Sequence, residues 1–449
     1  MPESFKDLAA IHWYLPEALL TLDSRAGPDA WQLQKNRALG VLQGQIVDIV
    51  EAQTAIHQAQ PAQITHLPGQ ILMPGLHNAH NHAAMVLFRG MADDLPLHVW
   101  LQSHIWPAEA RCVSPEFVRV GSRLAIAEML LSGTTSFSDM YFFPEVTAEV
   151  AAQMGIGAQL FAPLIDFANA WADNLDLALD KTLALHRTYR DHERIEIGLG
   201  PHAPYTLSDA SLSKIAAVAQ ANSLQVHMHV HETAQEITDS LQAHQQRPLA
   251  RIAAHGLCGP HFQAVHMTQV DEADIQCLLE SGAQVVHCPQ SNLKLASGFC
   301  PSARLLEAGV PLLLGTDGAA SNNDLDLWAE MQTAALLAKG VAQQADVMNT
   351  QQALSMACVT PGKHAKNQRG QLRAGYQADM ISLQLDQPDA LPLHHILSQL
   401  VYGRMADKVV NVWVAGQPCV RNKELLTADL EQIRHDAHLW VQKLNKDAL

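Results

Sequence analysis

The chain has 449 residues, and its 48% hydrophobic content is enough to bury the core of one large domain with a smaller companion. The 45 acidic residues against 29 basic ones give a formal net charge of -16, which argues against a nucleic-acid backbone or an anionic membrane surface as partner and favours a small-molecule substrate. No apolar run approaches the roughly 20 residues of a membrane-spanning helix, and the seven cysteines include no Cys-x-x-Cys pair. We therefore expect a soluble, cytoplasmic protein with reduced thiols.

Short strand-like pieces, broken by Gly and Pro, occupy both ends of the chain. Residues 18–22 and 38–42 near the N-terminus show the same apolar pattern as residues 378–383 and 409–416 near the C-terminus. We expect the two ends to share one sheet, in a small β-sandwich domain formed by residues 1–70 and 369–449. Residues 427–444 are apolar at helical spacing and predict a C-terminal helix in the second of these segments.

A His-x-His pair follows the apolar run at residues 70–73, and this run predicts a buried strand. His80 and His82 are two residues apart, and on an extended backbone such residues point the same way. Both imidazoles can therefore bind one metal ion, since imidazole nitrogen is a preferred ligand of zinc and similar divalent ions. Such a pair also arises by chance on surface loops, because the chain has 24 histidines, so the prediction depends on further ligands.

Short apolar strands separated by amphipathic helices fill residues 71–368. After the strand that carries His80, seven more are predicted at residues 134–138, 158–163, 195–200, 224–229, 264–267, 284–288 and 311–316, with helices such as 116–131 and 145–154 between them. This alternation fits an α/β, TIM-like (β/α)8 barrel, whose active sites lie at the C-terminal strand ends. A doubly wound open sheet is the alternative, although no Gly-x-Gly-x-x-Gly follows the first strand.

Polar residues stand where five of the later strands end. They are, in chain order, His202, His229, His266, His287 and Asp317. A lone histidine at a strand end is more often a hydrogen-bonded core or loop residue than a ligand. Five such residues at the same end of a barrel, in addition to the His-x-His pair, predict a joint site.

Three other motif interpretations fail on the same residues. His231 and Glu232 begin like a zinc-protease helix, but the second histidine of that motif is absent. A cytidine-deaminase site requires Pro-Cys-x-x-Cys, which the sequence does not contain. Residues 315–318 (GTDG) lack the Lys-Ser/Thr of a phosphate loop, and the aspartate would repel phosphate. Asp317 is better interpreted as a metal-facing carboxylate.

Together these residues resemble the metal site of the amidohydrolase superfamily, and the resemblance covers nearly the whole chain. More specific stretches are similar to its 5-methylthioadenosine/S-adenosylhomocysteine deaminase branch, namely residues 90–97 (GMADDLPL), 106–110 (WPAEA), 200–206 (GPHAPYT) and 287–295 (HCPQSNLKL). The resemblance implies four metal ligands, which are His80, His82, His229 and Asp317.

The number of metal ions follows from one further position in this resemblance. Barrel hydrolases with two bridged metals usually place a carbamylated lysine at the fourth strand, and this sequence has no lysine between Lys181 and Lys214. A single ion per chain is implied, Zn2+ or another divalent ion such as Fe2+.

The resemblance also implies the chemistry, which is hydrolytic removal of the amino group from C6 of an adenine ring. A bound metal lowers the pKa of water toward about 7, so that it can attack at neutral pH. Asp317 would take the proton of this water, His266 would orient it, and Glu232 would shuttle protons to N1 of the ring and to the leaving amine. Two alternatives are His266 as a metal ligand and Glu232 as only the cap of the next helix.

The resemblance to the same branch also implies which residues contact the substrate. His202 would hydrogen-bond a ring nitrogen of the purine, and Glu109 would accept hydrogen bonds from the ribose hydroxyls. Trp100 would line the pocket, although a tryptophan is more often a core residue. His287, in the 287–295 stretch, is the fourth candidate contact.

The 5′ substituent distinguishes the substrates of this branch. Members that use S-adenosylhomocysteine are thought to hold its carboxylate with arginines after the third strand, and this chain has no arginine between Arg123 and Arg187. We expect an apolar wall there and a preference for 5′-methylthioadenosine over adenosine and S-adenosylhomocysteine.

Other classes of protein stay open at this point. A deaminase or chlorohydrolase-like enzyme for another ring, such as guanine or an s-triazine, would keep the metal site, but Glu109 and His202 argue against it. A non-catalytic scaffold would have lost ligands. We expect a homo-oligomer, a dimer or a tetramer, with no nucleic-acid or membrane partner.

Overall fold

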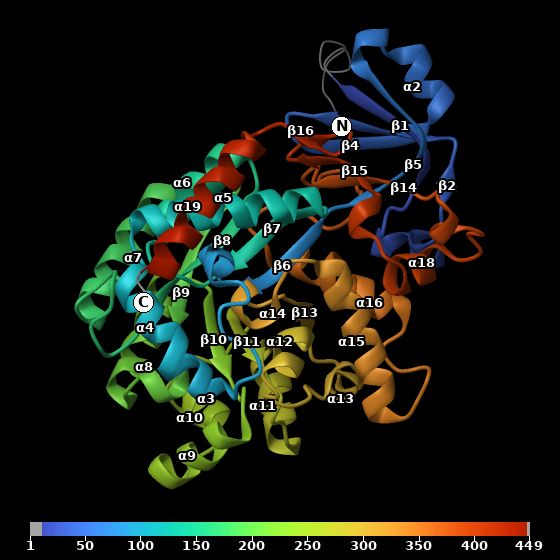
Figure 1. Cartoon of the computed structure of the whole chain (residues 1–449). Coiled ribbons are helices and arrows are strands. Elements are labelled where there is room, and N and C mark those ends of the chain that lie inside the picture. The colour runs from blue at the N-terminus through green and yellow to red at the C-terminus, as the bar shows by residue number, and fades with distance from the viewer. Residues whose placement is uncertain (1–10, 447–449) are drawn as a thin grey trace. The chain divides into compact units, whose positions relative to one another are not determined.

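The computed structural model describes residues 11–446, and within them the chain packs into two compact units (Figure 1). One unit comprises the residues up to His77, 127–136 and 350–429, and the other comprises residues 78–126, 137–349 and those from Leu430 onward. These units follow packing, so the domain boundaries expected from the sequence stay a prediction. Residues 1–10 and 447–449 of the expected terminal segments lie outside the described residues.

Eight strands, counted within residues 11–446, form one barrel sheet in which each pairs with its neighbour in chain order. They are β6 (Leu76–Asn81), β7 (Thr134–Asp139), β8 (Gly157–Leu164), β9 (Ile195–Pro201), β10 (Val226–Val230), β11 (Phe262–His266), β12 (Gln284–His287) and β13 (Leu312–Leu314). The pairings from β8 to β13 are parallel. The first and last strands meet, because the backbone N–H of Asp317 donates to the carbonyl of His80 at 2.9 Å. This closure confirms the (β/α)8 barrel and excludes the open sheet.

Helices alternate with these strands. They are α3 (Leu97–Val99), α4 (Trp106–Cys112), α5 (Pro115–Leu131), α6 (Pro144–Met154), α7 (Leu175–Tyr189), α8 (Asp209–Asn222), α9 (Ala234–His244), α10 (Pro248–Ala254), α11 (Glu272–Ser281), α12 (Pro289–Lys294), α13 (Ser302–Ala308), α14 (Ala319–Asn322) and α15 (Leu327–Ala342). The helices predicted at 116–131 and 145–154 are α5 and α6. Helices α6 and α7 pack against β8 and β9, and Figure 1 shows α6, α7 and α8 flanking the strands.

Polar caps explain where several of these helices begin. The side chains of Asn174, Ser208, Thr233 and Asp271 accept hydrogen bonds from backbone N–H groups in the first turns of α7, α8, α9 and α11. Those N–H groups have no partner inside a helix, so such a cap fixes the first turn. These four βα connections are thereby held at the end of the barrel where the candidate site residues lie.

The β domain is one mixed sheet of nine strands, β17-β16-β15-β14-β5-β1-β3-β4, with β2 paired to β1. Its strands are β1 (His12–Leu19), β2 (Gln34–Lys35), β3 (Arg37–Leu42), β4 (Gln45–Glu51), β5 (Ile64–Pro74), β14 (Met380–Gln384), β15 (Val409–Val414), β16 (Gln417–Arg421) and β17 (Glu424–Leu425). Strand β14 from the C-terminal part pairs antiparallel with β5, which pairs with β1. The prediction that both chain ends share one sheet is confirmed. The helices α2 (Ala52–Gln58), α16 (Thr350–Ala357), α17 (Val359–His364) and α18 (Ile396–Tyr402) belong to the same unit.

The apolar run at residues 70–73 was expected to be the barrel strand before the histidines, and the structure corrects this. The run lies in β5 of the β domain. Strand β5 ends at Pro74, before Gly75, where a Cβ would stand 2.2 Å from the Thr135 side chain and where the N–H donates to the carbonyl of Asp379. The barrel strand β6 therefore starts at Leu76 and contains His80, while His82 follows it.

The predicted C-terminal helix is α19 (Leu430–Lys446). Its Trp440 packs edge-on against Phe117 of α5, with the ring centroids 5.3 Å apart. Across residues 11–446, no helix has both the length and the apolar character needed to cross a membrane. All seven cysteines carry free thiols, and five of them are buried.

Candidate metal and active site

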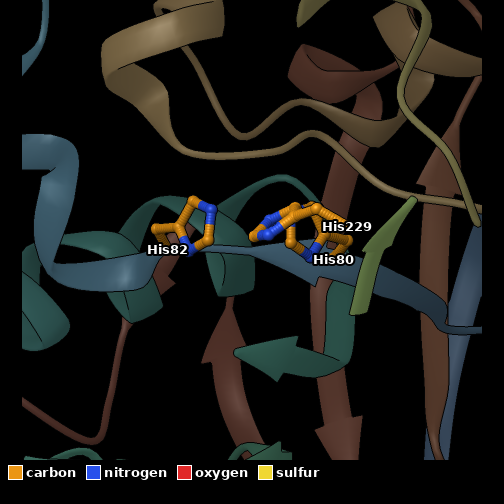
Figure 2. Close-up of side chains that lie close together, drawn as sticks. All are labelled: His80, His82 and His229. Atoms are coloured by element: carbon orange, nitrogen blue, oxygen red, sulfur yellow. The ribbon is translucent and has the colours of Figure 1, made fainter. Parts of the chain in front are cut away.

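The predicted ligands lie together at the C-terminal ends of the barrel strands. His80 is in β6 and His82 directly follows it, His229 is in β10, and Asp317 follows β13. Figure 2 shows the imidazoles of His80, His82 and His229 gathered at one place, and their ligand atoms lie within 4.8 Å of one another. Three separate strand ends thus contribute to one cluster.

The distances between these atoms are short enough for one shared divalent ion. Nε2 of His80 is 3.3 Å from Nε2 of His229 and 3.4 Å from Oδ1 of Asp317, and Nε2 of His82 is 3.3 Å from the same oxygen. Ligands at about 2.0–2.1 Å from a tetrahedral zinc ion stand about 3.3–3.4 Å apart. Three nitrogens and one carboxylate oxygen are also a donor set that zinc accepts. The residues therefore fit a divalent metal site.

In each of the three histidines, the Nδ1 atom, which lies away from the site, contacts another group. Nδ1 of His82 donates to the carbonyl of Met140 at 2.6 Å, and Nδ1 of His229 donates to the carbonyl of His202 at 2.7 Å. A carbonyl can only accept, so in both rings Nδ1 carries a proton, and Nε2 is the nitrogen that faces the site and that a metal ion would bind. Nδ1 of His80 lies 2.7 Å from another imidazole, that of His227.

The Asp317 carboxylate is fixed from two sides. Its backbone has φ 63, Oδ1 accepts from the N–H of Gly318 at 2.7 Å, and Oδ2 accepts from Oγ of Ser291 at 2.7 Å. Burial raises the pKa of this carboxyl, but hydrogen bonds and charges from His80 and His82 outweigh it and hold the pKa well below the usual range. Asp317 is therefore present as an anion.

His266 reaches the same centre from the end of β11. Together with His80 and Asp317 it forms a second group able to hold a metal ion. Its positive φ of 76 turns the side chain out of the strand alternation, and its Nδ1 lies 2.9 Å from Oδ1 of Asn292. Nε2 of His266 lies 3.8 Å from Oε2 of Glu232.

Glu232 stands just before helix α9, and its neighbours hold its backbone. The carboxylate of Glu236 accepts from the N–H groups of His231 at 2.9 Å and Glu232 at 2.8 Å. The side chain that caps α9 is that of Thr233, so Glu232 does not serve as the cap. Burial raises the pKa of Glu232, against a smaller lowering by the charge of His266, so this carboxyl holds a proton more readily than an exposed glutamate does.

A cavity of about 320 Å³ opens beside these residues. Trp100, Glu109 and His202 all line it, as do His82, His229, Glu232, His266 and Asp317. Trp100 lies in η4 (Trp100–Ile105) and Glu109 in α4, both in the segment that follows β6. The structure therefore brings most of the predicted site residues to one pocket of a size that fits a small ligand.

Two of the pocket residues are poised for polar contacts. The Tyr141 hydroxyl donates to Oε1 of Glu109 at 2.8 Å, and burial raises the pKa of Glu109 to about 7, against lowering by that hydrogen bond and by His82. Burial, with the charges of His82 and His80, lowers the pKa of His202 to about 4, so its imidazole is neutral. Nδ1 of His202 is buried and has no hydrogen-bond partner among the described residues.

His287 is the one predicted contact that the structure does not bring to the pocket. His229 pairs with Val265 and Val265 pairs with Val286, and residues paired across parallel strands share a face. His287, one residue further, therefore projects from the opposite face. It is 1% exposed, and neither ring nitrogen has a hydrogen-bond partner in the part of the chain that the structure describes.

Three further residues belong to the site without having been singled out from the sequence. They are Tyr141, which contacts Glu109, Ser291, which contacts Asp317, and Asn292, which contacts His266. Ser291 and Asn292 lie in the 287–295 stretch, so their position was a usable signal. Tyr141 follows β7 by two residues, and nothing in the local sequence marks it.

The model of the Amidohydrolase family matches residues 71–419. The chain is 48% identical, over 92% of its length and 94% of the relative's, to the 5-methylthioadenosine/S-adenosylhomocysteine deaminase of Teredinibacter turnerae. It is 37% identical, over 95% of its length and 96% of the relative's, to the 5'-deoxyadenosine deaminase of Methanosarcina mazei. The crystal structure of an adenosine deaminase from Xanthomonas campestris with bound zinc is similar with a TM-score of 0.93 and 42% identity, and the match covers 97% of this chain and 98% of that one.

Proposed function

The chain belongs to the amidohydrolase family, and from this premise we propose that it deaminates adenine nucleosides, with 5′-methylthioadenosine as the preferred substrate and 5′-methylthioinosine and ammonia as products. The observation that carries the proposal is one pocket in which Glu109, His202 and Glu232 stand beside the metal-ligand cluster. The names of relatives at 48% and 37% identity support adenine nucleosides as the substrate class.

His80, His82, His229 and Asp317 would hold one zinc ion. A bound divalent ion acts as a Lewis acid and lowers the pKa of a coordinated water toward about 7. The separations of 3.3–3.4 Å in three pairs of these ligand atoms support one shared ion. Strand β9, the fourth of the barrel, has the sequence IEIGLGP and offers no lysine to bridge a second ion, which supports one ion per chain.

Glu232 is the proposed proton shuttle. Hydrolysis at C6 requires a proton at N1 of the ring and another on the departing amine. Glu232, whose pKa burial raises, would give its proton to N1, then take the second proton of the attacking water and pass it to the amine. The Asp317 carboxylate would take the first proton of that water and return it to Glu232 at the end of the cycle. Asn292 holds Nδ1 of His266, so that Nε2 of His266 faces Glu232. In this position His266 would orient the water. The alternative is that His266 acts as a further metal ligand.

The other pocket residues recognise the nucleoside. The Glu109 carboxylate would accept hydrogen bonds from the ribose hydroxyls, with the Tyr141 hydroxyl fixing its second oxygen. The unpartnered Nδ1 of His202 would bond a ring nitrogen of the purine, and Trp100 would form part of the pocket wall. Glu109 would thus recognise the ribose, and His202 would recognise the purine.

The 5′ end of the nucleoside would meet an apolar wall. Pro163, Ile165 and Phe167, at the end of β8 and just beyond it, line the pocket. Among the described residues, no lysine or arginine lines this pocket. A methylthio group suits this wall, whereas the charged tail of S-adenosylhomocysteine lacks a partner there.

The homo-oligomeric state and the cytoplasmic location stay predictions.

Ammonia release from a panel of compounds tests the proposal. The panel contains 5′-methylthioadenosine, adenosine, S-adenosylhomocysteine, free adenine, guanine and an s-triazine, each with zinc-loaded protein and with Glu232→Gln as the inactive control. We expect the highest kcat/KM for 5′-methylthioadenosine. Release of ammonia from guanine or the s-triazine, with none from any adenine nucleoside, would overturn the proposal.

A further inference from the structure

A second histidine lies behind the His80 ring. His227 is in β10, two residues before His229, and its Nε2 lies 2.7 Å from Nδ1 of His80. On its other side, Nδ1 of His227 lies 2.7 Å from Oε1 of Gln263 in β11. His80 and His227 are 0% exposed and Gln263 is 2% exposed, so water does not replace these partners. The three side chains form a buried chain of hydrogen bonds that ends at the candidate metal ligand.

The position of each group follows from the strands. His227 pairs with Gln263 in the parallel register of β10 and β11, so the two side chains share a face. The His227 ring stacks on Phe161 of β8, with centroids 4.5 Å apart and planes 19° apart. Its edge meets the His80 ring, with centroids 5.0 Å apart and planes 28° apart. The stacking on Phe161 and the hydrogen bonds at its edge together fix the plane of the His227 ring.

His80 differs from the other two ligand histidines in what holds its Nδ1. Nδ1 of His82 donates to the carbonyl of Met140, and Nδ1 of His229 donates to the carbonyl of His202. A carbonyl oxygen can only accept a hydrogen bond, so the tautomer of these two rings is fixed. Nδ1 of His80 instead faces an imidazole nitrogen, which donates or accepts according to its tautomer. The tautomer of His80 thus depends on the group at the far end of the chain.

Gln263, at the far end of the chain of hydrogen bonds, determines the tautomers of His227 and His80. Its Oε1 accepts the proton on Nδ1 of His227, which leaves Nε2 of His227 bare. That nitrogen then accepts from Nδ1 of His80, and Nε2 of His80 is bare where it faces His229 and Asp317. The opposite arrangement, with the amide N–H toward His227, would place a proton on Nε2 of His80, and a protonated nitrogen cannot bind a metal.

We propose that His227 and Gln263 are positioning residues that hold His80 in the tautomer and orientation required of a metal ligand. This inference rests on the proposed metal site and adds to it a determinant of metal affinity outside the ligands. Neither side chain lines the substrate pocket. Their effect should therefore appear in the retention of the metal before it appears in substrate binding.

The test measures the zinc dissociation constant by competition with a chelator, together with the melting temperature of the metal-free protein. Gln263→Leu removes the acceptor, and His227→Phe keeps a stacking ring without nitrogens. We expect each to weaken zinc binding about 10–100-fold, the usual effect of losing a group that orients a ligand. Gln263→Glu keeps an acceptor oxygen and should restore affinity close to that of the unmodified protein.

Gln284 provides a matched control. It is the register partner of Gln263 on β12, it is 1% exposed, and its amide nitrogen bonds the carbonyl of Pro260 rather than a histidine. Gln284→Leu should lower the melting temperature about as much as Gln263→Leu but leave zinc affinity unchanged. If His227→Phe does not fold, the Gln263 and Gln284 pair still decides the matter.

Each outcome has a separate meaning. Equal zinc affinity in Gln263→Leu and the unmodified protein, with only a lower melting temperature, would show that the chain of hydrogen bonds is structural and overturn the inference. Equal weakening in Gln263→Leu and Gln284→Leu would overturn it too. Failure of the unmodified protein to bind zinc would instead count against the proposed function.

Discussion

Replacement of the methylthio group of 5′-methylthioadenosine by the homocysteine tail of S-adenosylhomocysteine should lower kcat/KM strongly. The pocket wall at Pro163, Ile165 and Phe167 is apolar. The guanidinium of Arg251, which lines a neighbouring cavity, is 2% exposed and already bonds Asp209 at 2.7 Å and two backbone carbonyls at 2.7 and 2.8 Å. The substrate carboxylate therefore meets no unused cation within the described lining of either cavity.

The size of the effect follows from desolvation. A charged group buried without a partner costs on the order of several kcal/mol, and a value of about 2–4 kcal/mol corresponds to about 30–1000-fold in kcat/KM. Each buried carbon of the methylthio group contributes about 0.8 kcal/mol in the opposite direction. 5′-Methylthioadenosine should therefore also exceed adenosine, by a smaller factor.

Steady-state kinetics with the three nucleosides, followed by the change in ultraviolet absorbance on deamination, measures these ratios. Phe167 lines the pocket and is 53% exposed, so Phe167→Arg can place a guanidinium at the rim, and Phe167→Gln is its uncharged control. Only the arginine variant should raise kcat/KM for S-adenosylhomocysteine. A value for S-adenosylhomocysteine equal to or above that for 5′-methylthioadenosine in the unmodified protein would refute the reasoning.

Other predictions concern the two carboxyls of the pocket. Glu232→Gln should lower turnover about 10²–10⁴-fold while metal content and melting temperature stay unchanged, and near-normal turnover would remove Glu232 from the mechanism. Glu109→Ala should lower kcat/KM for nucleosides about 10–150-fold, from a charged hydrogen bond of about 1.5–3 kcal/mol, and leave free adenine unaffected, whereas equal losses for both would mean a structural role. Burial raises the pKa of Glu109 to about 7, so its carboxylate forms as pH rises through 7, and KM for 5′-methylthioadenosine should fall between pH 6 and 8. A KM that varies equally in Glu109→Gln would contradict that assignment.

The barrel and the clustering of the candidate ligands could be predicted because their signals are local. Each apolar strand is bounded in sequence, and His80, His229 and Asp317 stand at or just beyond strand ends, where a (β/α)8 barrel gathers side chains. The start of the first strand could not be predicted, because only Gly75 separates the apolar end of β5 from β6. What separates them is the close approach of Thr135 to Gly75, a contact between distant residues.

The sequence also could not predict which face of a strand each histidine projects from. His266 and His287 both end a strand, and their sequence contexts do not distinguish them. A positive φ turns His266 into the site, whereas His287 keeps the strand alternation and faces away. The partner of each buried polar group, such as Tyr141 for Glu109 or Gln263 for His227, likewise depends on register between separate strands or loops.

Titration of metal-free protein with zinc tests the central claim most directly, with 5′-methylthioadenosine deamination and bound metal measured on the same samples. A site made of His80, His82, His229 and Asp317 predicts no activity without metal and a linear rise to a plateau at one ion per chain. Full activity after exhaustive chelation, or a plateau reached only at two ions per chain, would contradict the account.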